Sequence, residues 1–420
     1  MNSRERLIAA INHKKPDKVP LDIGATAVTG IHALALDRLR KRLNYTDKPV
    51  IVYEVLQQLG LIETEDIQAL GIDVCGILPY SGFTGAVNDE FVPYANTFGI
   101  DLFCPKGYKT KFEPETGNTY AYPQGDLSAE PSQIMPEGGC FFDNIDRSQH
   151  SLDDSGDPVK DLAAESFAVM SDAEAEFYQK QAEQIKNSSD LGLIGNLAPA
   201  GFGDVAFLPG PGIKSPRGIR SMTDWIMAHK IIPEYVHAVY EYHAEIGLKN
   251  LEIYRQAVGD SIQVIFMGGT DFGTQRGLMI AREDFREFYM PYWKKMNNWV
   301  HENTNWKTFY HTCGAVSGLI GDFIESGADI LNPVQCSAEG MEAEKLKKEF
   351  GSSIVFWGGG MDTQKILPFG TEEEVREMVR DRIDVFSENG GFIFNTIHNI
   401  QADTPIENIA AMLDEVGKYR

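Results

Sequence analysis

After residue 190, the chain alternates short apolar runs with longer amphipathic segments. Segments with the apolar spacing of helices, such as 233–258, 283–303 and 372–389, separate runs that are rich in β-forming residues. This repeated order of strand and helix predicts a parallel sheet with helical crossovers. The predicted strands are 191–196, 262–268, 308–311, 328–333, 353–359 and 391–396.

The first 80 residues extend the same pattern. We predict a helix over 3–13, which Asn2 or Ser3 can cap, and a second helix over 30–43. Apolar runs at 18–24 and 73–78 predict two further strands. About eight strand–helix units in a chain of 420 residues favour a (β/α)8 TIM barrel with an N-terminal helical extension. An open doubly wound sheet is the rival architecture.

Residues 85–150 interrupt this rhythm. They are rich in Gly, Pro, Tyr and Phe, and they contain short alternating pieces such as "GYKTKFEP" and "NTYAYP". These features predict a region of antiparallel strands and loops that is inserted within the barrel. We therefore expect one domain over residues 1–420, with 85–150 as an insertion.

Composition narrows the classes of partner. The chain is 43% hydrophobic, so it can bury a large core, and its net charge is −23. That charge argues against binding to nucleic acids and anionic membranes, since both attract clustered Lys and Arg. We find neither the apolar core of a signal peptide nor an apolar run of ~18–20 residues, as a membrane span requires. Five scattered cysteines suggest a reducing cytoplasm, and an exposed barrel face could pair two chains as a homodimer.

Polar side chains follow the predicted strands. Active sites of such barrels lie where the strands end and the next loops begin. The residues at these positions are Asp271 after 262–268, His311 and Cys313 after 308–310, Gln335 and Cys336 after 328–333, Gly359 and Asp362 after 353–357, and His398 after 391–396.

Each of these residues also has an ordinary structural explanation. A lone His at a strand end is usually a hydrogen-bonded structural residue, and two ligands do not hold a metal. Asp271, between glycines, could cap a turn. Gly359, in "GGG", could form a tight turn or let a substrate approach the backbone closely. The case for chemistry depends on whether these strand ends meet.

Zinc is the metal that this residue set favours. Catalytic zinc takes three protein ligands and keeps an open position. His311 and Cys313 provide two ligands, and His398 or Cys336 provides the third. A thiolate with imidazoles suits Zn²⁺ better than Mg²⁺ or Ca²⁺.

Four segments together resemble the uroporphyrinogen decarboxylase superfamily. They are "RERLIAAINHKKPDKVPLDIG", "HTCGAVSGLIGDFIESGADILNPVQ", "FWGGGMDTQKILPFGTEEEVREMV" and "HNIQADTPIENIAAM". The resemblance covers the first 25 residues and most of the chain after 190, and it implies a (β/α)8 barrel. One branch of the superfamily decarboxylates uroporphyrinogen without a cofactor. The other contains zinc-dependent methyltransferases that exchange a methyl group with a corrinoid protein.

Departures from the family pattern favour the methyltransferase branch. The decarboxylases carry an arginine-rich stretch after the first strand, whereas this chain reads "LDIGATAVTGIH" there. His311 and Cys313 match the H-x-C of the methyltransferases, and His398 stands where their third ligand is usually Cys. His398 also matches a histidine that the decarboxylases carry near their C-terminus.

The resemblance thus implies a corrinoid-dependent methyltransferase of the O-demethylating type. Its substrate would be a small methylated compound, such as a methoxylated aromatic, and a separate corrinoid protein would accept the methyl group. The expected zinc ligands are His311, Cys313 and His398, with Cys336 in reserve. Asp271 would orient the substrate or bond to a ligand histidine, while Gln335, Gly359 and Asp362 would contact the substrate.

Two other hypotheses stay open. In a decarboxylase acting on a tetrapyrrole, Asp271 and His398 would be catalytic groups that work without a metal. A third interpretation is a non-catalytic module that docks a corrinoid protein.

Overall fold

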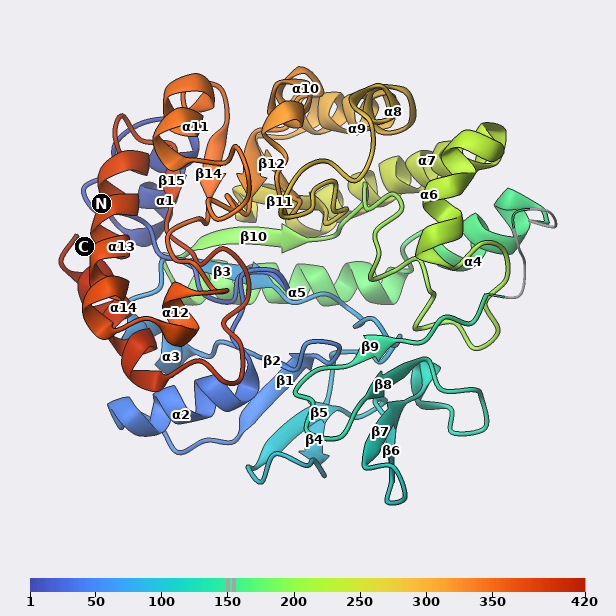
Figure 1. Ribbon diagram of the computed structural model, residues 1–420, viewed down its shortest axis with the longest axis horizontal. Helices are drawn as coiled ribbons and strands as arrows, with labels where there is room; N and C mark the ends of the chain where they lie inside the picture. Colours follow the sequence, from blue (N-terminus) through green and yellow to red (C-terminus); the bar gives the residue numbers. More distant parts are fainter. Residues whose placement is uncertain (149–151, 153–155, 420) are drawn as a thin grey trace.

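The computed structural model describes residues 1–148, 152 and 156–419, and a parallel sheet lies at its centre (Figure 1). Within these residues the sheet has seven strands in the order β15-β14-β13-β12-β11-β10-β3, and every neighbouring pair is parallel. The strands are β3 (Val74–Ile77), β10 (Gly192–Asn196), β11 (Val264–Gly268), β12 (Lys307–His311), β13 (Ile330–Asn332), β14 (Val355–Trp357) and β15 (Phe392–Ile393).

One hydrophobic cluster shows that this sheet is curled. It collects side chains from all seven strands, together with Leu7, Ala10 and Ile11 of helix α1 (Ser3–Ile11). The strand residues in it are Val74, Ile194, Val264, Phe309, Ile330, Val355, Trp357 and Ile393. The sheet curls around this cluster, since the segment at Leu21 contacts both of its edges, beside β15 and beside β3.

The segment around Leu21 lies between the two edge strands. Leu21 forms a parallel bridge to Phe394, beside β15, and its carbonyl accepts a hydrogen bond from Asp73 N at 2.9 Å, beside β3. The strand predicted at 18–24 is therefore a single bridge. The structure supports a barrel-like fold. Within the described chain, however, the central parallel sheet has seven assigned strands and not the eight of a full (β/α)8 barrel.

Helices cover the outside of the sheet (Figure 1). The predicted helices at 3–13, 30–43, 233–258 and 372–389 correspond to α1, α2, α7 and α13. After α1, the α-helices of the described chain are α2 (Ala33–Leu43), α3 (Thr64–Leu70), α4 (Ala164–Ser166), α5 (Asp172–Ser188), α6 (Met222–Ile231), α7 (Pro233–Val258), α8 (Arg282–Asp284), α9 (Met290–Asn303), α10 (Ile320–Glu325), α11 (Ala343–Phe350), α12 (Ile366–Phe369), α13 (Glu372–Phe386) and α14 (Ile406–Gly417). Short 3-10 and π segments are η1 (Pro123–Gly125), η3 (Val159–Ala163), η4 (Gly259–Ser261), η5 (Phe285–Tyr289) and η6 (Ser317–Leu319).

Two smaller sheets lie beside the barrel-like part, at the bottom of Figure 1. One is antiparallel and joins β6 (Thr110–Glu113), β7 (Asn118–Ala121), β8 (Gln133–Met135) and β9 (Asp143–Asn144). The other joins β2 (Leu59–Gly60), β1 (Val50–Glu54), β5 (Leu102–Pro105) and β4 (Phe91–Tyr94), with β1 and β5 parallel. Antiparallel strands were predicted for 85–150, whose last two residues lie outside the described chain. The pairing of β1 with β5 ties this region to residues before it.

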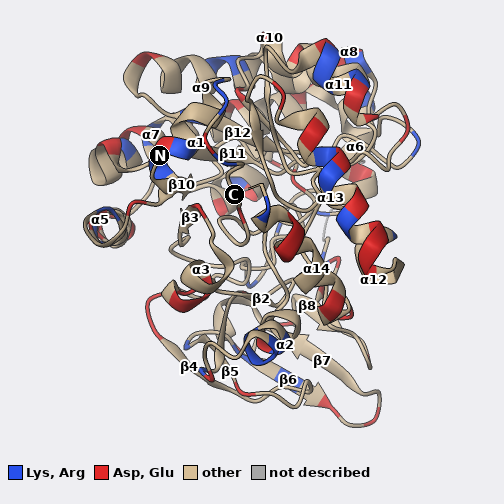
Figure 2. Cartoon of the chain, turned by 90° about the vertical axis from the view of Figure 1, so that its left-hand side faces the viewer, with Lys and Arg blue, Asp and Glu red and all other residues tan. Residues whose placement is uncertain are grey.

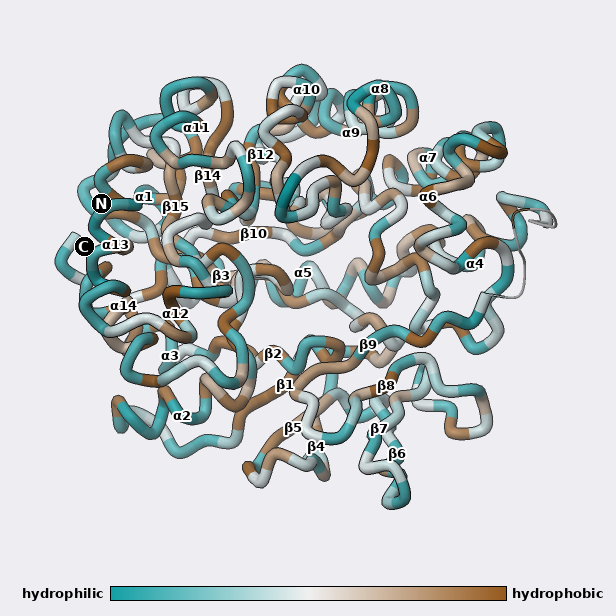
Figure 3. Tube along the Cα trace, viewed as in Figure 1, coloured by the Kyte–Doolittle hydropathy of each residue, from teal (hydrophilic) through white to brown (hydrophobic). Residues whose placement is uncertain are grey.

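Charged and apolar residues are separated in the usual way. Lys, Arg, Asp and Glu gather on the outer helices and loops in Figure 2, and apolar residues follow the central strands in Figure 3. No helix of the described chain combines the length and the apolar character that crossing a bilayer requires.

Candidate active site

His311 and Cys313 lie where β12 gives way to its following loop. His311 is the last residue of β12 and is only 3% exposed. Cys313 is held by its backbone, because its N–H donates to Asp271 Oδ1 at 2.7 Å. The Cys313 Sγ then lies 3.4 Å from His311 Nε2. The H-x-C pair therefore aims one nitrogen and one sulfur at the same place.

The orientation of the His311 ring follows from its neighbour on β13. Asn332 Nδ2 donates to Trp357 O at 2.8 Å, which leaves Asn332 Oδ1 as the acceptor facing His311 Nδ1 at 2.6 Å. The Nδ1 atom must then carry the proton, and the Nε2 lone pair points toward Cys313. A hydrogen bond to the second ring nitrogen is the usual way in which proteins orient a ligating histidine.

His398, in the loop that follows β15, completes a group of three. His311, Cys313 and His398 each offer one candidate ligand atom, and these three atoms lie within 4.8 Å of one another. The two imidazole rings have centroids 5.3 Å apart. Within the described chain, Cys336 is not part of this group, although it was the reserve ligand.

Burial sets the protonation of this group. It lowers the pKa of His311 and of His398 to about 4, so both rings are neutral at pH 7 and keep a lone pair. Burial, together with the carboxylate of Asp271, raises the pKa of the Cys313 thiol. Neutral imidazoles are ready ligands, and binding of a cation would displace the Cys313 thiol proton into solvent.

Asp271 lies beside the group of three candidate ligands. Its Oδ1 is 4.0 Å from His311 Nε2 and accepts the Cys313 N–H. Burial raises the pKa of Asp271, while the hydrogen bond from Cys313 N–H and, to a smaller extent, His398 oppose that rise. This carboxylate thus fixes the loop that carries Cys313.

The three residues that we expected to contact the substrate lie elsewhere. Gln335 Oε1 accepts from Gly314 N at 2.7 Å, and Asp362 Oδ1 accepts from Gln364 N at 2.9 Å and Lys365 N at 2.5 Å. Gly359 is packed against the backbone of Val334. None of these three lines the cavity described next, and their contacts support the loops around the site.

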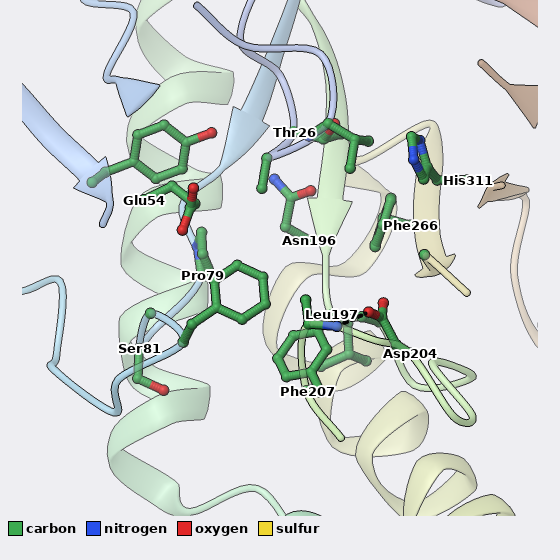
Figure 4. A pocket seen from close by; sticks show the side chains of 18 of the residues that line it. Thr26, Glu54, Pro79, Ser81, Asn196, Leu197, Asp204, Phe207, Phe266 and His311 are labelled. Carbon is green, nitrogen blue, oxygen red and sulfur yellow. Dashed lines mark hydrogen bonds between the residues drawn. The ribbon is translucent and has the colours of Figure 1, made fainter. Parts of the chain in front are cut away.

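A cavity of about 500 Å³ is lined by two of the candidate ligands, His311 and His398, and Figure 4 shows His311 at its edge. His311, His398 and Asp271 form one wall, and aromatic and aliphatic side chains make up much of the rest. This volume suits a single aromatic ring with substituents. The aromatic side chains of the lining are Tyr53, Phe83, Tyr178, Phe207 and Phe266.

The structure adds two buried carboxylates that we did not predict. Glu54 ends β1, and Asp204 lies in the loop after β10. Burial raises the pKa of each to about 7. Asp204 follows the predicted strand 191–196, so the rule that we applied to later strands would have found it. Glu54 follows the apolar run "VIVY", which we did not predict as a strand.

A known protein family matches the C-terminal half of this chain, where three of the four family-like segments lie. The family model described as "Uroporphyrinogen decarboxylase (URO-D)" matches residues 214–419. The uroporphyrinogen decarboxylase of Bordetella petrii is 24% identical over 196 residues, which are 44% of this chain and 49% of that protein. The enzyme of the same name from Ruthia magnifica is 22% identical over 189 residues, 44% of this chain and 50% of that one. The matches thus span about half the length of these curated relatives.

A solved structure matches the whole chain. A methyltransferase from Methanosarcina mazei superposes with a TM-score of 0.54 at 14% identity, covering 100% of this chain and 99% of that one. At that identity the likeness shows the fold. The resemblance to the uroporphyrinogen decarboxylase superfamily that the motifs indicated is confirmed, most directly for residues 214–419, which carry His311, Cys313 and His398.

Proposed function

We propose that this protein is a corrinoid-dependent methyltransferase that removes the methyl group of a small methoxylated aromatic compound. The observation that carries the proposal is the convergence of His311, Cys313 and His398 beside a ring-sized cavity that the two histidines line. The likeness in fold to a methyltransferase supports it, as does the superfamily resemblance.

The three side chains fit a zinc ion chemically. Two neutral imidazoles and a thiol are ligands that Zn²⁺ accepts, and three protein ligands leave a position for a substrate atom. Asn332 fixes the proton of His311 on Nδ1, so that Nε2 is free to bind. A bound zinc would supply Lewis-acid polarisation of the ether oxygen.

The other residues of the site bind and orient the substrate. The aromatic walls pack against the ring of the substrate and keep water from its reacting methyl group. Asp271 holds the loop of Cys313 in place through the backbone N–H. A partner corrinoid, when bound, would supply the electron pair that takes up the methyl group as the bond between the methyl carbon and the ether oxygen breaks. The phenolate keeps the pair of the broken C–O bond and then takes a proton from water.

Metal content and methyl transfer test this function together. We expect about one zinc per chain in protein purified without chelator, and transfer of the methyl group of a methoxylated phenol to a Co(I) corrinoid. His311→Ala and Cys313→Ala should lose both. His237→Ala and Cys140→Ala are matched controls because neither residue is in the group of three or lines the cavity. Retention of zinc and turnover by His311→Ala would refute the assignment.

The decarboxylase hypothesis draws support from the names of the curated relatives. The cavity lining opposes it, because no Lys or Arg of the described chain lines the cavity, whereas Glu54, Glu174, Asp204 and Asp271 do. A substrate with many carboxylates needs cationic partners. Turnover with any methyl donor would also exclude a purely docking role.

A further inference from the structure

The charged groups that line the cavity all have the same sign. Glu54, Glu174, Asp204 and Asp271 contribute carboxyl groups, and the lining holds no Lys or Arg within the described chain. In Figure 4, Glu54 and Asp204 lie on opposite walls of the cavity. A ligand in the cavity therefore meets acidic groups on both sides.

Glu54 is held firmly by the turn that follows it. Its Oε1 accepts from Leu56 N at 2.7 Å, and its Oε2 accepts from Gln57 N at 2.8 Å. Glu54 is only 4% exposed. Two backbone donors on a buried carboxylate fix its position, so it cannot swing away from a ligand.

Asp204 has an oxygen without a partner. Its Oδ1 accepts from Ala206 N at 2.8 Å, but Oδ2 makes no hydrogen bond with any residue that the structure describes. Asp204 is only 7% exposed. The hydroxyl of Tyr53, another lining residue that is 4% exposed, also lacks a partner within the described chain. A buried polar atom without a partner is costly, so the Tyr53 hydroxyl points to a ligand that completes it, and Asp204 Oδ2 is free to accept from the same ligand.

We propose, building on the methyl transfer proposed above, that the methyl donor carries a hydrogen-bond-donating substituent with no negative charge. Hydroxyl, hydroxymethyl and ammonium groups meet this requirement, and a ring carboxylate does not. The donor would bond to Asp204 Oδ2 or to the Glu54 carboxylate, while the methyl ether faces His311 and His398.

Electrostatic interactions determine how strongly the cavity should prefer a neutral or cationic substituent over an anionic one. A carboxylate ligand would bring a further negative charge into a partly desolvated cavity that offers it no cation, where repulsion is poorly screened. An ammonium group would instead gain from each ionised carboxylate. Because burial holds the pKa of Glu54 and of Asp204 at about 7, binding of a cation would also favour their ionised forms.

Three ring-matched probes test the proposal. They are 3-methoxybenzylamine, 3-methoxybenzyl alcohol and 3-methoxybenzoate, which share the methyl ether and differ only in whether the second substituent is a cation, a neutral donor or an anion. Binding is measured by calorimetry on the full chain without corrinoid. We expect the amine and the alcohol to bind and the benzoate to bind at least about tenfold more weakly.

Two substitutions test whether Asp204 and Glu54 cause the preference for the amine over the benzoate. Asp204→Asn should reduce the amine-to-benzoate affinity ratio by about tenfold, since it removes the charge and adds an amide donor. Glu54→Gln should act in the same direction, and Glu349→Gln, at an exposed surface carboxylate, should leave the ratio unchanged. Asp204 accepts only one backbone hydrogen bond, so its variant should fold even if the Glu54 variant does not.

Binding and transfer separate the two proposals. Equal or tighter binding of the benzoate, or no binding of any probe, would overturn the selection proposed here. Selective binding without methyl transfer to a Co(I) corrinoid would uphold this selection and refute the proposed reaction.

Discussion

At the scale of single residues, Asn332 decides what His311 can do. Its amide is locked, because Nδ2 donates to Trp357 O and Oδ1 therefore faces the imidazole. Without that acceptor, either nitrogen of His311 could carry the proton, and the ring could rotate. Asn332 is not itself a candidate ligand. It contacts the His311 ring at Nδ1, so its effect on a bound metal would act through the orientation of that ring.

Asn332→Leu should weaken zinc binding by about 10- to 100-fold, the usual effect of losing a hydrogen bond that orients a ligand. Competition with a chromophoric chelator measures the affinity. Asn408→Leu is the matched control, since that buried amide donates to Leu367 O and Gly370 O, away from the cavity. Unchanged affinity in Asn332→Leu would show that His311 does not depend on this bond.

Asp204 should make stability depend on pH. Its pKa is raised by burial from 3.8 to about 7, so the folded chain holds this proton more tightly than the unfolded chain. The resulting stabilisation is complete below about pH 4 and disappears as pH rises through 7. Asp204→Asn cannot ionise, so it should match the wild type near pH 4 and exceed its stability at pH 8 by up to about 4 kcal/mol.

Urea unfolding of metal-stripped protein at pH 4.5, 6 and 8 measures this difference. Glu349→Gln, which replaces an exposed carboxylate, should show no such trend. A constant difference between Asp204→Asn and the wild type across pH would mean that the pKa of Asp204 is not raised.

At the scale of elements, two loops hold each other at the ends of neighbouring strands. The loop after β11 carries Asp271 and the loop after β12 carries Cys313. They touch at Gly314, where an added Cβ would lie 2.3 Å from the carbonyl carbon of Gly273. Gly314 also has φ of +92°, which side chains rarely adopt. Close contact between the loops depends on this glycine.

Gly314→Ala should therefore cost about 2–4 kcal/mol of stability and displace Cys313 from His311, with loss of zinc. Thermal unfolding and metal analysis of one preparation report both effects. Gly318→Ala is the control, because Gly318 is exposed and its added Cβ meets only Leu278 Cδ1 at 3.8 Å. A Gly314→Ala protein with full zinc content would show that the loops can separate without disturbing the site.

The elements also show what the sequence could predict. Hydrophobic periodicity located β10 to β15 and the helices between them, because buried parallel strands read as short apolar runs. The ends of β12 and β15 then brought His311, Cys313 and His398 together as expected. Prediction failed for 18–24, which makes a single bridge, while Gln335, Gly359 and Asp362 contact neighbouring loops and are not in the lining of the cavity. Whether a strand-end side chain faces the cavity or a neighbouring loop depends on loop conformation, which periodicity does not encode.

At the scale of the whole molecule, the cavity joins parts of the chain that are far apart in sequence. Glu54 comes from β1, in the sheet beside the barrel-like part, and Asp204 comes from the loop after β10. Their meeting depends on how the small sheet packs against the large one. No local pattern predicts that packing, and the charge of the cavity became visible only in the structure.

The negative charge of the cavity and of the chain predicts which of the two superfamily reactions this protein does not catalyse. Uroporphyrinogen carries many carboxylates, whereas this chain has a net charge of −23 and a cavity without Lys or Arg in its described lining. Repulsion should keep such a substrate out. We expect no release of carbon dioxide from uroporphyrinogen above the rate without enzyme, with zinc-loaded or metal-stripped protein, between pH 6 and 8. Release by metal-stripped protein, lost in Asp271→Asn and kept in Asp260→Asn, would instead make this enzyme a decarboxylase.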